Sequence, residues 1–127
     1  MARKRSLTLT EAELRLMEVL WEKRRATVAD VTESLGPPAL AYNSVLTTLR
    51  ILEQKGYVSH EEDGRAYVYS PVLERDEAAR SAVGHLVQRY FGSNAGALAL
   101  RLVADERPSD EELQRLKALI ERYEDQR

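Results

Sequence analysis

Cysteine is absent from the sequence, and histidine occurs only twice, as His60 and His85. The absence of cysteine excludes disulfides, thiolate metal ligands and cysteine nucleophiles. The two histidines are far apart in sequence, and neither has a partner at a zinc-binding spacing such as H-x-x-x-H. We therefore expect no metal and no cofactor.

Long apolar runs are also missing. No stretch approaches the ~20 residues of a membrane helix, and the basic start MARKRS is followed by SLTLTEAEL where a signal peptide would have its apolar segment. We expect a cytoplasmic protein without membrane insertion. The net charge of the 127-residue chain is −2, so bulk charge does not indicate a nucleic-acid partner.

Residue patterns typical of catalysis are missing as well. The acidic run after His60, H-E-E-D, would lie on a strand, where consecutive side chains point to opposite faces and do not converge. Ser81 and Ser93 have no base at a recognisable spacing. We expect that the protein is not an enzyme.

The first half of the chain carries signals for three helices. Thr10 begins a T-E-A-E capping box, and the helix through about residue 24 would bury Leu14, Met17, Leu20 and Trp21. Thr27 caps a second helix, VADVTESL, and Gly36 is expected in the left-handed position after its last turn. A third helix spans about 40–55 and ends at Gly56.

A β-hairpin follows the third helix. Tyr57 and Val58 begin one β-rich run, Tyr67 to Tyr69 form another, and Pro71 closes it. Between the runs, Asp63-Gly64 predicts a type I′ turn. Two short helices joined by a turn and followed by a hairpin predict a winged helix-turn-helix over residues 1–72.

The second half is helical, over about 74–91, 95–104 and 109–124, with a break at Phe91-Gly92-Ser93-Asn94. Three such helices without a sheet cannot readily bury their leucines in one chain. We expect residues 73–127 to form a helical dimerisation domain; folding back onto the first domain is the alternative. The residues expected at the dimer contact are Leu86, Tyr90, Phe91, Leu98, Leu102, Leu113, Leu116, Leu119 and Ile120. The predicted fold is therefore mainly α with a small β-hairpin.

The third helix, within AYNSVLTTLRILEQKGYV, has an unusual outer face. Exposed helix faces usually carry Lys and Glu, whereas this face offers an amide, hydroxyls and one guanidinium, which suit the major groove of DNA. Asn43 suits adenine, and Arg50 suits guanine or a phosphate. Arg65 at the hairpin tip and a basic N-terminal arm suit phosphate or the minor groove. The predicted DNA-binding residues are Tyr42, Asn43, Ser44, Thr47, Thr48, Arg50, Lys55, Arg65 and Arg5.

A winged helix can also serve protein–protein contact, which is the alternative function. Such a module would carry exposed apolar residues on the third helix. Ile51 is the only candidate on that face, so the polar character favours DNA.

Three segments resemble the penicillinase-repressor family of winged-helix repressors, which includes the methicillin-resistance repressors. They are LTEAELRLMEVLWEKRRATVADV, the pattern Y-x-[ST]-V-x-T-x-L-x-x-L-x-x-K-G followed by D-G-R-A-Y, and FGSNAGALALRLVADERPSDEELQRLKAL. The resemblance implies a bacterial homodimer that binds an inverted-repeat DNA operator and represses transcription. It also implies release by cleavage in the C-terminal region, downstream of a membrane sensor protease. The best-aligned bond is Arg101–Leu102, although its flanks differ from the asparagine–phenylalanine pair associated with such sites.

Overall fold

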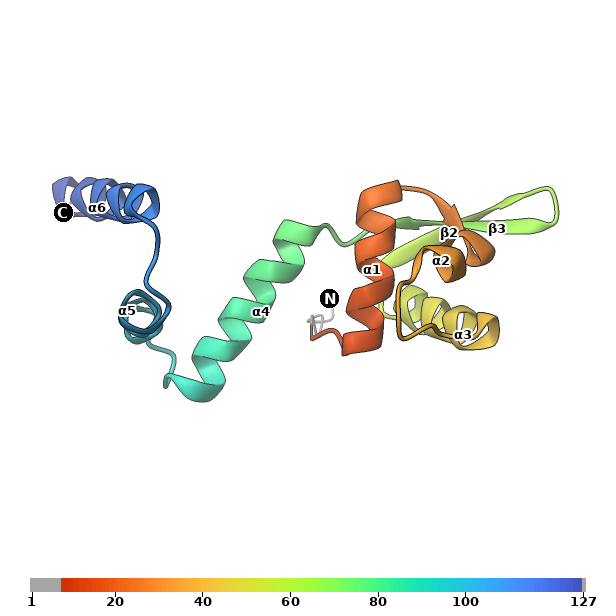
Figure 1. Ribbon diagram of the computed structural model, residues 1–127, viewed down its shortest axis with the longest axis horizontal. Coiled ribbons are helices and arrows are strands. Elements are labelled where there is room, and N and C mark those ends of the chain that lie inside the picture. Colours follow the sequence, from red (N-terminus) through yellow and green to blue (C-terminus); the bar gives the residue numbers. More distant parts are fainter. Residues whose placement is uncertain (1–7, 127) are drawn as a thin grey trace, which may run out of the picture. The chain divides into compact units, whose positions relative to one another are not determined.

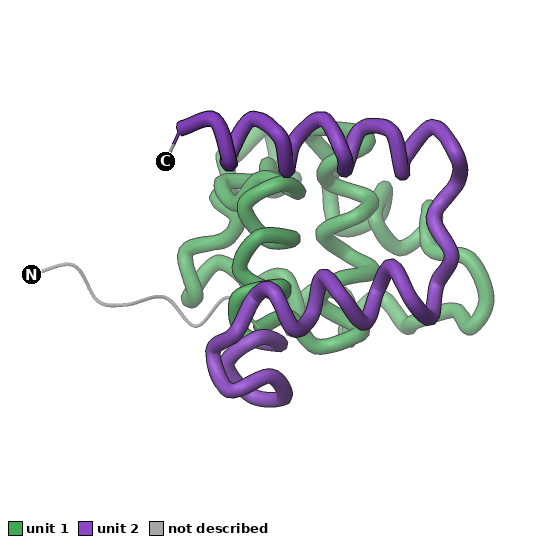
Figure 2. The backbone as a smooth tube through the Cα atoms, turned by 90° about the vertical axis from the view of Figure 1, so that its left-hand side faces the viewer, with its two compact units in different colours: residues 1–85 green, residues 86–127 purple. Residues whose placement is uncertain are grey.

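The chain divides into two compact units, Met1–His85 and Leu86–Arg127 (Figure 2). A computed structural model describes residues 8–126 (Figure 1), and Arg5 of the predicted basic arm lies outside these residues. The elements are α1 (Glu11–Lys23), β1 (Ala26–Thr27), α2 (Val28–Ser34), α3 (Tyr42–Gln54), β2 (Val58–Asp63), β3 (Ala66–Pro71), α4 (Arg75–Tyr90), α5 (Ala95–Glu106) and α6 (Asp110–Asp125).

Side-chain caps define where most of the helices begin. Thr10 caps α1 and Ser109 caps α6, each in a complete capping box, which confirms both predictions. Thr27 caps α2 as predicted, with Asp30 as its reciprocal partner. Asn94 caps α5 by accepting a hydrogen bond from the Ala97 N–H. Each cap satisfies backbone N–H groups that the helix itself leaves unpaired.

The sheet has three antiparallel strands in the order β1-β3-β2. The sequence predicted only the β2–β3 hairpin; the third strand, β1, pairs Ala26 with Tyr69 and Thr27 with Val68. In Figure 1 the β2–β3 hairpin, here called the wing, extends beyond helices α1–α3. Through β1, which directly precedes α2, the sheet joins the wing to the helix-turn-helix.

The core of the first unit lies among α1, α2, α3 and the sheet. On α1 the buried positions are Glu13, Leu16, Met17, Leu20 and Trp21. The prediction that Leu14 is buried is wrong, because the i, i+3, i+4, i+7 series starts at Glu13 and leaves Leu14 40% exposed. The other fully buried large side chains are Val31, Val45, Leu49, Leu52, Tyr57, Tyr69 and Leu73.

The end of α2 also differs from the prediction. The chain leaves the helix at Leu35 with extended backbone angles, φ −72° and ψ 126°. The glycines with positive φ are Gly56, Gly64 and Gly92, so Gly36 does not adopt the left-handed conformation. Gly56, at φ 82°, ends α3 as predicted.

The second unit buries very little by itself. Within residues 86–126, only Val87 and Leu98 are buried, and α6 has no buried residue. No helix in the described part of the chain is long and apolar enough to cross a membrane.

Candidate nucleic-acid interface

Helix α3 presents one apolar face to the core and one polar face to solvent. Val45, Leu49 and Leu52 are fully buried, while Asn43 and Thr47 are exposed. Unlike the four helices with side-chain caps, α3 begins after Ala41 without such a cap. Its first turn contains no acidic residue. The first N–H groups of α3, at the positive end of the helix dipole, therefore remain open to an anion.

The remaining predicted residues at the start of α3 are also accessible. Tyr42 is 51% exposed, and Ser44 is exposed. Thr48 is half-buried, and its hydroxyl donates to the Ser44 carbonyl at 2.8 Å. The hydroxyl proton of Thr48 is thus already used within the helix, which leaves its oxygen and methyl for an external contact.

The turn before α3 is held from α1. Arg15 Nη2 donates to the carbonyl oxygens of Gly36 and Pro38, both at 2.8 Å. These bonds fix the approach of the chain to α3. Sequence reasoning missed this role, because nothing in the sequence relates Arg15 to carbonyls more than twenty residues later.

Lys55, at the end of α3, has a strong partner inside the protein. Its Nζ lies 2.7 Å from Glu13 Oε2, and the Glu13 side chain is 5% exposed against 36% for Lys55. The ammonium group therefore neutralises a buried carboxylate. The role of Lys55 as a phosphate contact stays a prediction.

The wing turns at Gly64 and Arg65. Asp63 pairs with Ala66, so the two-residue loop is Gly64-Arg65, and only Gly64 has a positive φ, of 65°. This pattern is typical of a type II′ turn, so the predicted type I′ turn centred on Asp63-Gly64 is wrong. Arg65 lies in the loop itself, fully at the tip, and its side chain is exposed.

A polar contact joins the wing to the end of α3. His60 Nδ1 lies 2.8 and 2.7 Å from the two carboxylate oxygens of Glu53 and donates to them. The His60 ring stacks on Tyr67, with 4.4 Å between ring centroids. Burial and the negative charge of Glu53 raise the pKa of the Tyr69 hydroxyl, which stays neutral.

The other acids of the H-E-E-D run are exposed, and the described residues hold no group of three or more potential metal ligands.

An open groove of about 410 Å³ lies between α3 and the wing. Tyr42, Leu46 and Arg50 line it from α3, and residues 65–67 line it from the wing. Residues 27–29 also line it. Arg50 thus stands at the edge of the polar face, beside the groove, whereas Asn43 and Thr47 do not line it.

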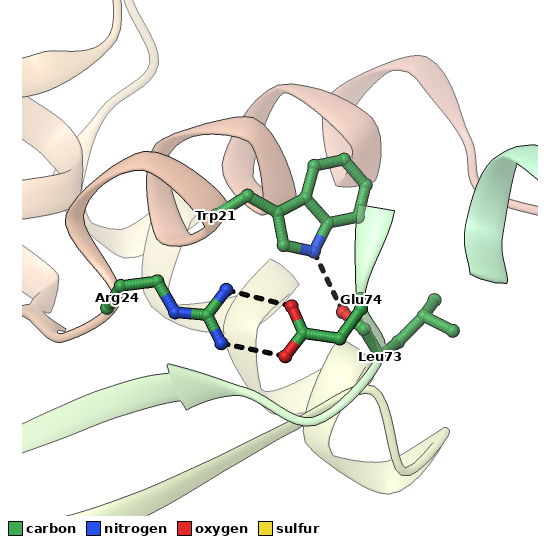
Figure 3. Close-up of polar contacts among 4 residues, drawn as sticks. All are labelled: Trp21, Arg24, Leu73 and Glu74. Atoms are coloured by element: carbon green, nitrogen blue, oxygen red, sulfur yellow. Dashed lines mark hydrogen bonds and ion pairs between the residues drawn. The ribbon is translucent and has the colours of Figure 1, made fainter. Parts of the chain in front are cut away.

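The connection from the wing to α4 is anchored on α1 (Figure 3). Trp21 Nε1 donates to the Leu73 carbonyl at 2.8 Å, and Arg24 makes a two-point ion pair with Glu74 at 2.8 and 2.7 Å. The Arg24 guanidinium holds the pKa of the Glu74 carboxyl below its usual value. The guanidinium of Arg75 lies 4.8 Å from the centre of the Trp21 ring. These contacts fix the first turn of α4 to the winged helix.

The predicted dimerisation residues lie on the surface of the second unit or near it. Leu98 is buried, and Phe91, Leu113 and Leu116 are half-buried. The exposed ones are Leu86, Tyr90, Leu102, Leu119 and Ile120. A largely apolar groove of about 440 Å³ runs between α5 and α6 and includes Leu102, Leu116 and Leu119.

The predicted cleavage bond, Arg101–Leu102, lies inside α5. Arg101 pairs with Asp105 one turn further on, at 3.5 Å. A protease binds its substrate in an extended form, so cleavage here would require α5 to unwind.

Comparison with known proteins identifies the family. The family model described as penicillinase repressor matches residues 9–122. The chain belongs to the penicillinase repressor family. The penicillinase repressor of Bacillus licheniformis is 22% identical over 120 residues, which cover 94% of each chain. The transcriptional regulator BlaI of Mycobacterium tuberculosis is 32% identical over 109 residues, covering 71% of this chain and 79% of that protein.

A solved structure supports the fold of the first unit. The solution structure of the DNA-binding domain of the repressor BlaI superposes with a TM-score of 0.51 and 26% identity, covering 61% of this chain and 93% of that one. The chain is therefore a DNA-binding transcriptional repressor with a winged helix and C-terminal helices, and it is not an enzyme.

Proposed function

We propose that this penicillinase repressor family member binds a palindromic operator as a homodimer and blocks transcription sterically. In each half-site α3 enters the major groove, and the wing contacts the flanking backbone or minor groove. The observation that carries the proposal is the outer face of α3, which is exposed, polar, free of acids in its first turn and uncapped by any side chain. A face of this kind fits between two rows of phosphates.

Base reading falls to the residues at the start of α3. Asn43 is suited to adenine through a two-point hydrogen bond, and Thr47 can meet a base edge or a thymine methyl. Ser44 and Thr48 contact either a phosphate or a base, and the Thr48 methyl can meet a thymine methyl. Tyr42 serves partly the core and partly a backbone contact. Arg65, Lys55 and Arg5 contribute register and affinity through phosphates, and Arg50 contacts either guanine or a phosphate.

The homodimer is formed by residues 73–127, and residues 1–72 bind DNA. Support comes from the second unit, which buries only two of its described side chains and exposes Leu119 at 47% and Ile120 at 57%. Such a unit gains its core by pairing with a second copy. Two-fold symmetry then places the two α3 helices about 34–36 Å or a multiple apart on the DNA.

Derepression by a membrane sensor protease belongs to this proposal as a separate step. Cleavage at Arg101–Leu102 would divide α5, remove α6 from the chain and so weaken the dimer. Incubating the protein with such a protease and finding an intact chain would argue against this step alone.

Selection of genomic fragments by the full chain at two salt concentrations tests the main proposal. We expect a palindromic sequence, recovered less efficiently at high salt because phosphate contacts release counterions. Asn43→Ala should cost about 1–3 kcal/mol of binding free energy and relax the preference at one position of each half-site. A protein that enriches no sequence at either salt concentration would favour the alternative, a winged helix that contacts another protein.

A further inference from the structure

Two arginines of the first unit differ from all the others that the structure describes there. Arg50 and Arg65 make no hydrogen bond, ion pair or ring contact with another described residue. Every other arginine in residues 8–85 has a partner within the protein: Arg15 with two backbone carbonyls, Arg24 with Glu74, Arg25 with Glu61, Arg75 with the Trp21 ring and Arg80 with Asp76.

The same two arginines line one groove, from opposite sides. Arg50 reaches it from α3, in a row with Tyr42 and Leu46 at i, i+4 and i+8, and Arg65 reaches it from the tip of the wing. Asn43 and Thr47 belong to the neighbouring row of α3, outside the groove. Arg50 therefore lies beside the wing. It is more than two helical turns along α3 from Tyr42, the first residue of the helix.

The charge of the groove is of one sign. None of the described residues that line it is acidic. Glu53, the acid nearest to Arg50 along α3, is held by His60 on the wing at 2.7 Å. The groove thus combines two guanidinium groups that have no carboxylate partner with apolar lining from Val28, Leu46 and Ala66. This combination suits a ligand that is anionic at one edge and carries less polar sugar rings beside the charge.

We propose that Arg50 and Arg65 hold the same stretch of the sugar-phosphate backbone of one DNA strand in this groove. Arg50 is then a phosphate contact and not a reader of guanine, and sequence is read by the row that contains Asn43 and Thr47. The inference rests on the proposed function, because it needs α3 to lie in the major groove. It assigns the groove to a phosphodiester and makes the two arginines a single unit.

The test measures the affinity of the full chain for its selected operator and for a scrambled duplex, over a series of salt concentrations. Arg50→Ala should weaken binding to both duplexes by the same factor, about tenfold or more. It should also reduce the slope of log affinity against log salt concentration by roughly one unit for each copy of Arg50 in the complex. Arg50→Lys should keep the slope, since a phosphate accepts any cation. Arg80→Ala, which removes an equal charge from α4, is the matched control and should change neither.

The double variant Arg50→Ala/Arg65→Ala tests whether the two groups act together. If they hold one stretch of backbone, it should lose less affinity than the product of the two single losses. A strictly multiplicative loss would refute a shared ligand. A loss for Arg50→Ala on the operator alone, with unchanged slope, would assign Arg50 to a base. Failure of the proposed function is distinguishable, since the unaltered protein would then show no preference for the operator over the scrambled duplex.

Discussion

Glu13 is the only buried charged side chain among the described residues, at 4% exposure, and it links α1 to the end of α3. Its carboxylate accepts hydrogen bonds from the Thr10 N–H at 2.8 Å and from Lys55 Nζ at 2.7 Å. Burial alone would raise the pKa of Glu13, but the hydrogen bonds from Lys55 and Thr10 outweigh it and hold the pKa below the ordinary 4.5. The ionised form is therefore part of the folded state.

Glu13→Gln should lower the free energy of unfolding by about 1–3 kcal/mol at pH 7, because Lys55 loses its charged partner. A folded-state pKa below the unfolded one stabilises the protein above pH 4.5, and this stabilisation is lost as the pH falls through the lower folded value. The difference between the two proteins in urea unfolding should therefore shrink in acid. Glu11→Gln, in the same helical turn but exposed, is the control. Equal effects of the two substitutions would contradict this account.

His60 on the wing binds the carboxylate of Glu53 on α3. Glu53 lies three residues after Arg50 on α3, a spacing at which opposite charges pair. In the structure its carboxylate is held by His60 instead. We therefore expect the histidine to keep the Arg50 guanidinium free of a partner from its own helix.

His60→Ala should weaken operator binding about two- to fivefold, because the released Glu53 carboxylate competes for Arg50. Adding Glu53→Gln to that variant should restore the affinity, as measured by fluorescence anisotropy of a labelled operator. If the second substitution restores nothing, the loss comes from a displaced wing and the charge argument fails.

These pairs mark the limit of what the sequence could predict about single residues. The exposed polar row of α3 was predictable, because helical periodicity alone separates it from Val45, Leu49 and Leu52. The partner of Lys55 was not, since Glu13 lies 42 residues earlier and is brought beneath it only by the packing of α1 on α3. Glu13 looked like a simple member of a capping box and also serves as a buried counter-ion.

At the scale of elements, the wing depends on one glycine in its turn. Gly64 has a φ of 65°, a backbone conformation that residues with a side chain rarely adopt and that costs them about 1–3 kcal/mol. Gly64→Ala should therefore lower the melting temperature even though its Cβ would meet nothing within 4 Å. Gly84→Ala is the matched control, because Gly84 lies inside α4, has no positive φ and also has open space around it.

The control substitution should have the opposite effect. Alanine in the interior of an exposed helix is favoured over glycine by about 0.5–1 kcal/mol, so Gly84→Ala should raise the melting temperature. If both substitutions shifted it in the same direction, backbone conformation would not be the cause.

The starts of α1 and α6 were predicted closely because each capping box is a short sequence motif at the helix end, T-E-A-E at Thr10 and S-D-E-E at Ser109. The strand β1 was missed because it has only two residues, Ala26 and Thr27, too few for an alternating pattern. The turn was displaced by one residue for a related reason. In D-G-R the register is fixed by the pairing of Asp63 with Ala66, which the dipeptide Asp-Gly does not determine.

At the scale of the whole molecule, the distribution of apolar surface separates the two units. The first unit buries a contiguous apolar core, although it leaves Tyr42 51% exposed. The described part of the second unit buries only Val87 and Leu98 and leaves Tyr90, Leu100 and Tyr123 exposed at 71%, 76% and 65%. The leucine stripes favoured this, because three helices without a sheet cannot readily bury their leucines in one chain, with folding back onto the first domain as the alternative. Which stripe meets which could not be predicted, because that depends on tertiary packing and not on periodicity.

Ile120 lies on the stripe of α6 and is 57% exposed, so it offers a direct test of the homodimer. Ile120→Glu should convert the dimer to a monomer in sedimentation velocity, because a carboxylate would have to be buried without a partner. Operator affinity should then fall by a factor of about 10²–10⁴, since two linked binding events become independent.

Gln114→Glu supplies the same charge on the opposite side of α6, where Gln114 is exposed, and it should leave both the dimer and its affinity unchanged. The first unit provides an internal check, because its core includes none of the substituted positions and its wing and α3 should keep their binding to a single half-site. A dimer that survives Ile120→Glu would remove α6 from the interface. A monomer that still binds the full operator as tightly as the unaltered protein would separate dimerisation from operator recognition and overturn the proposed division between the two domains.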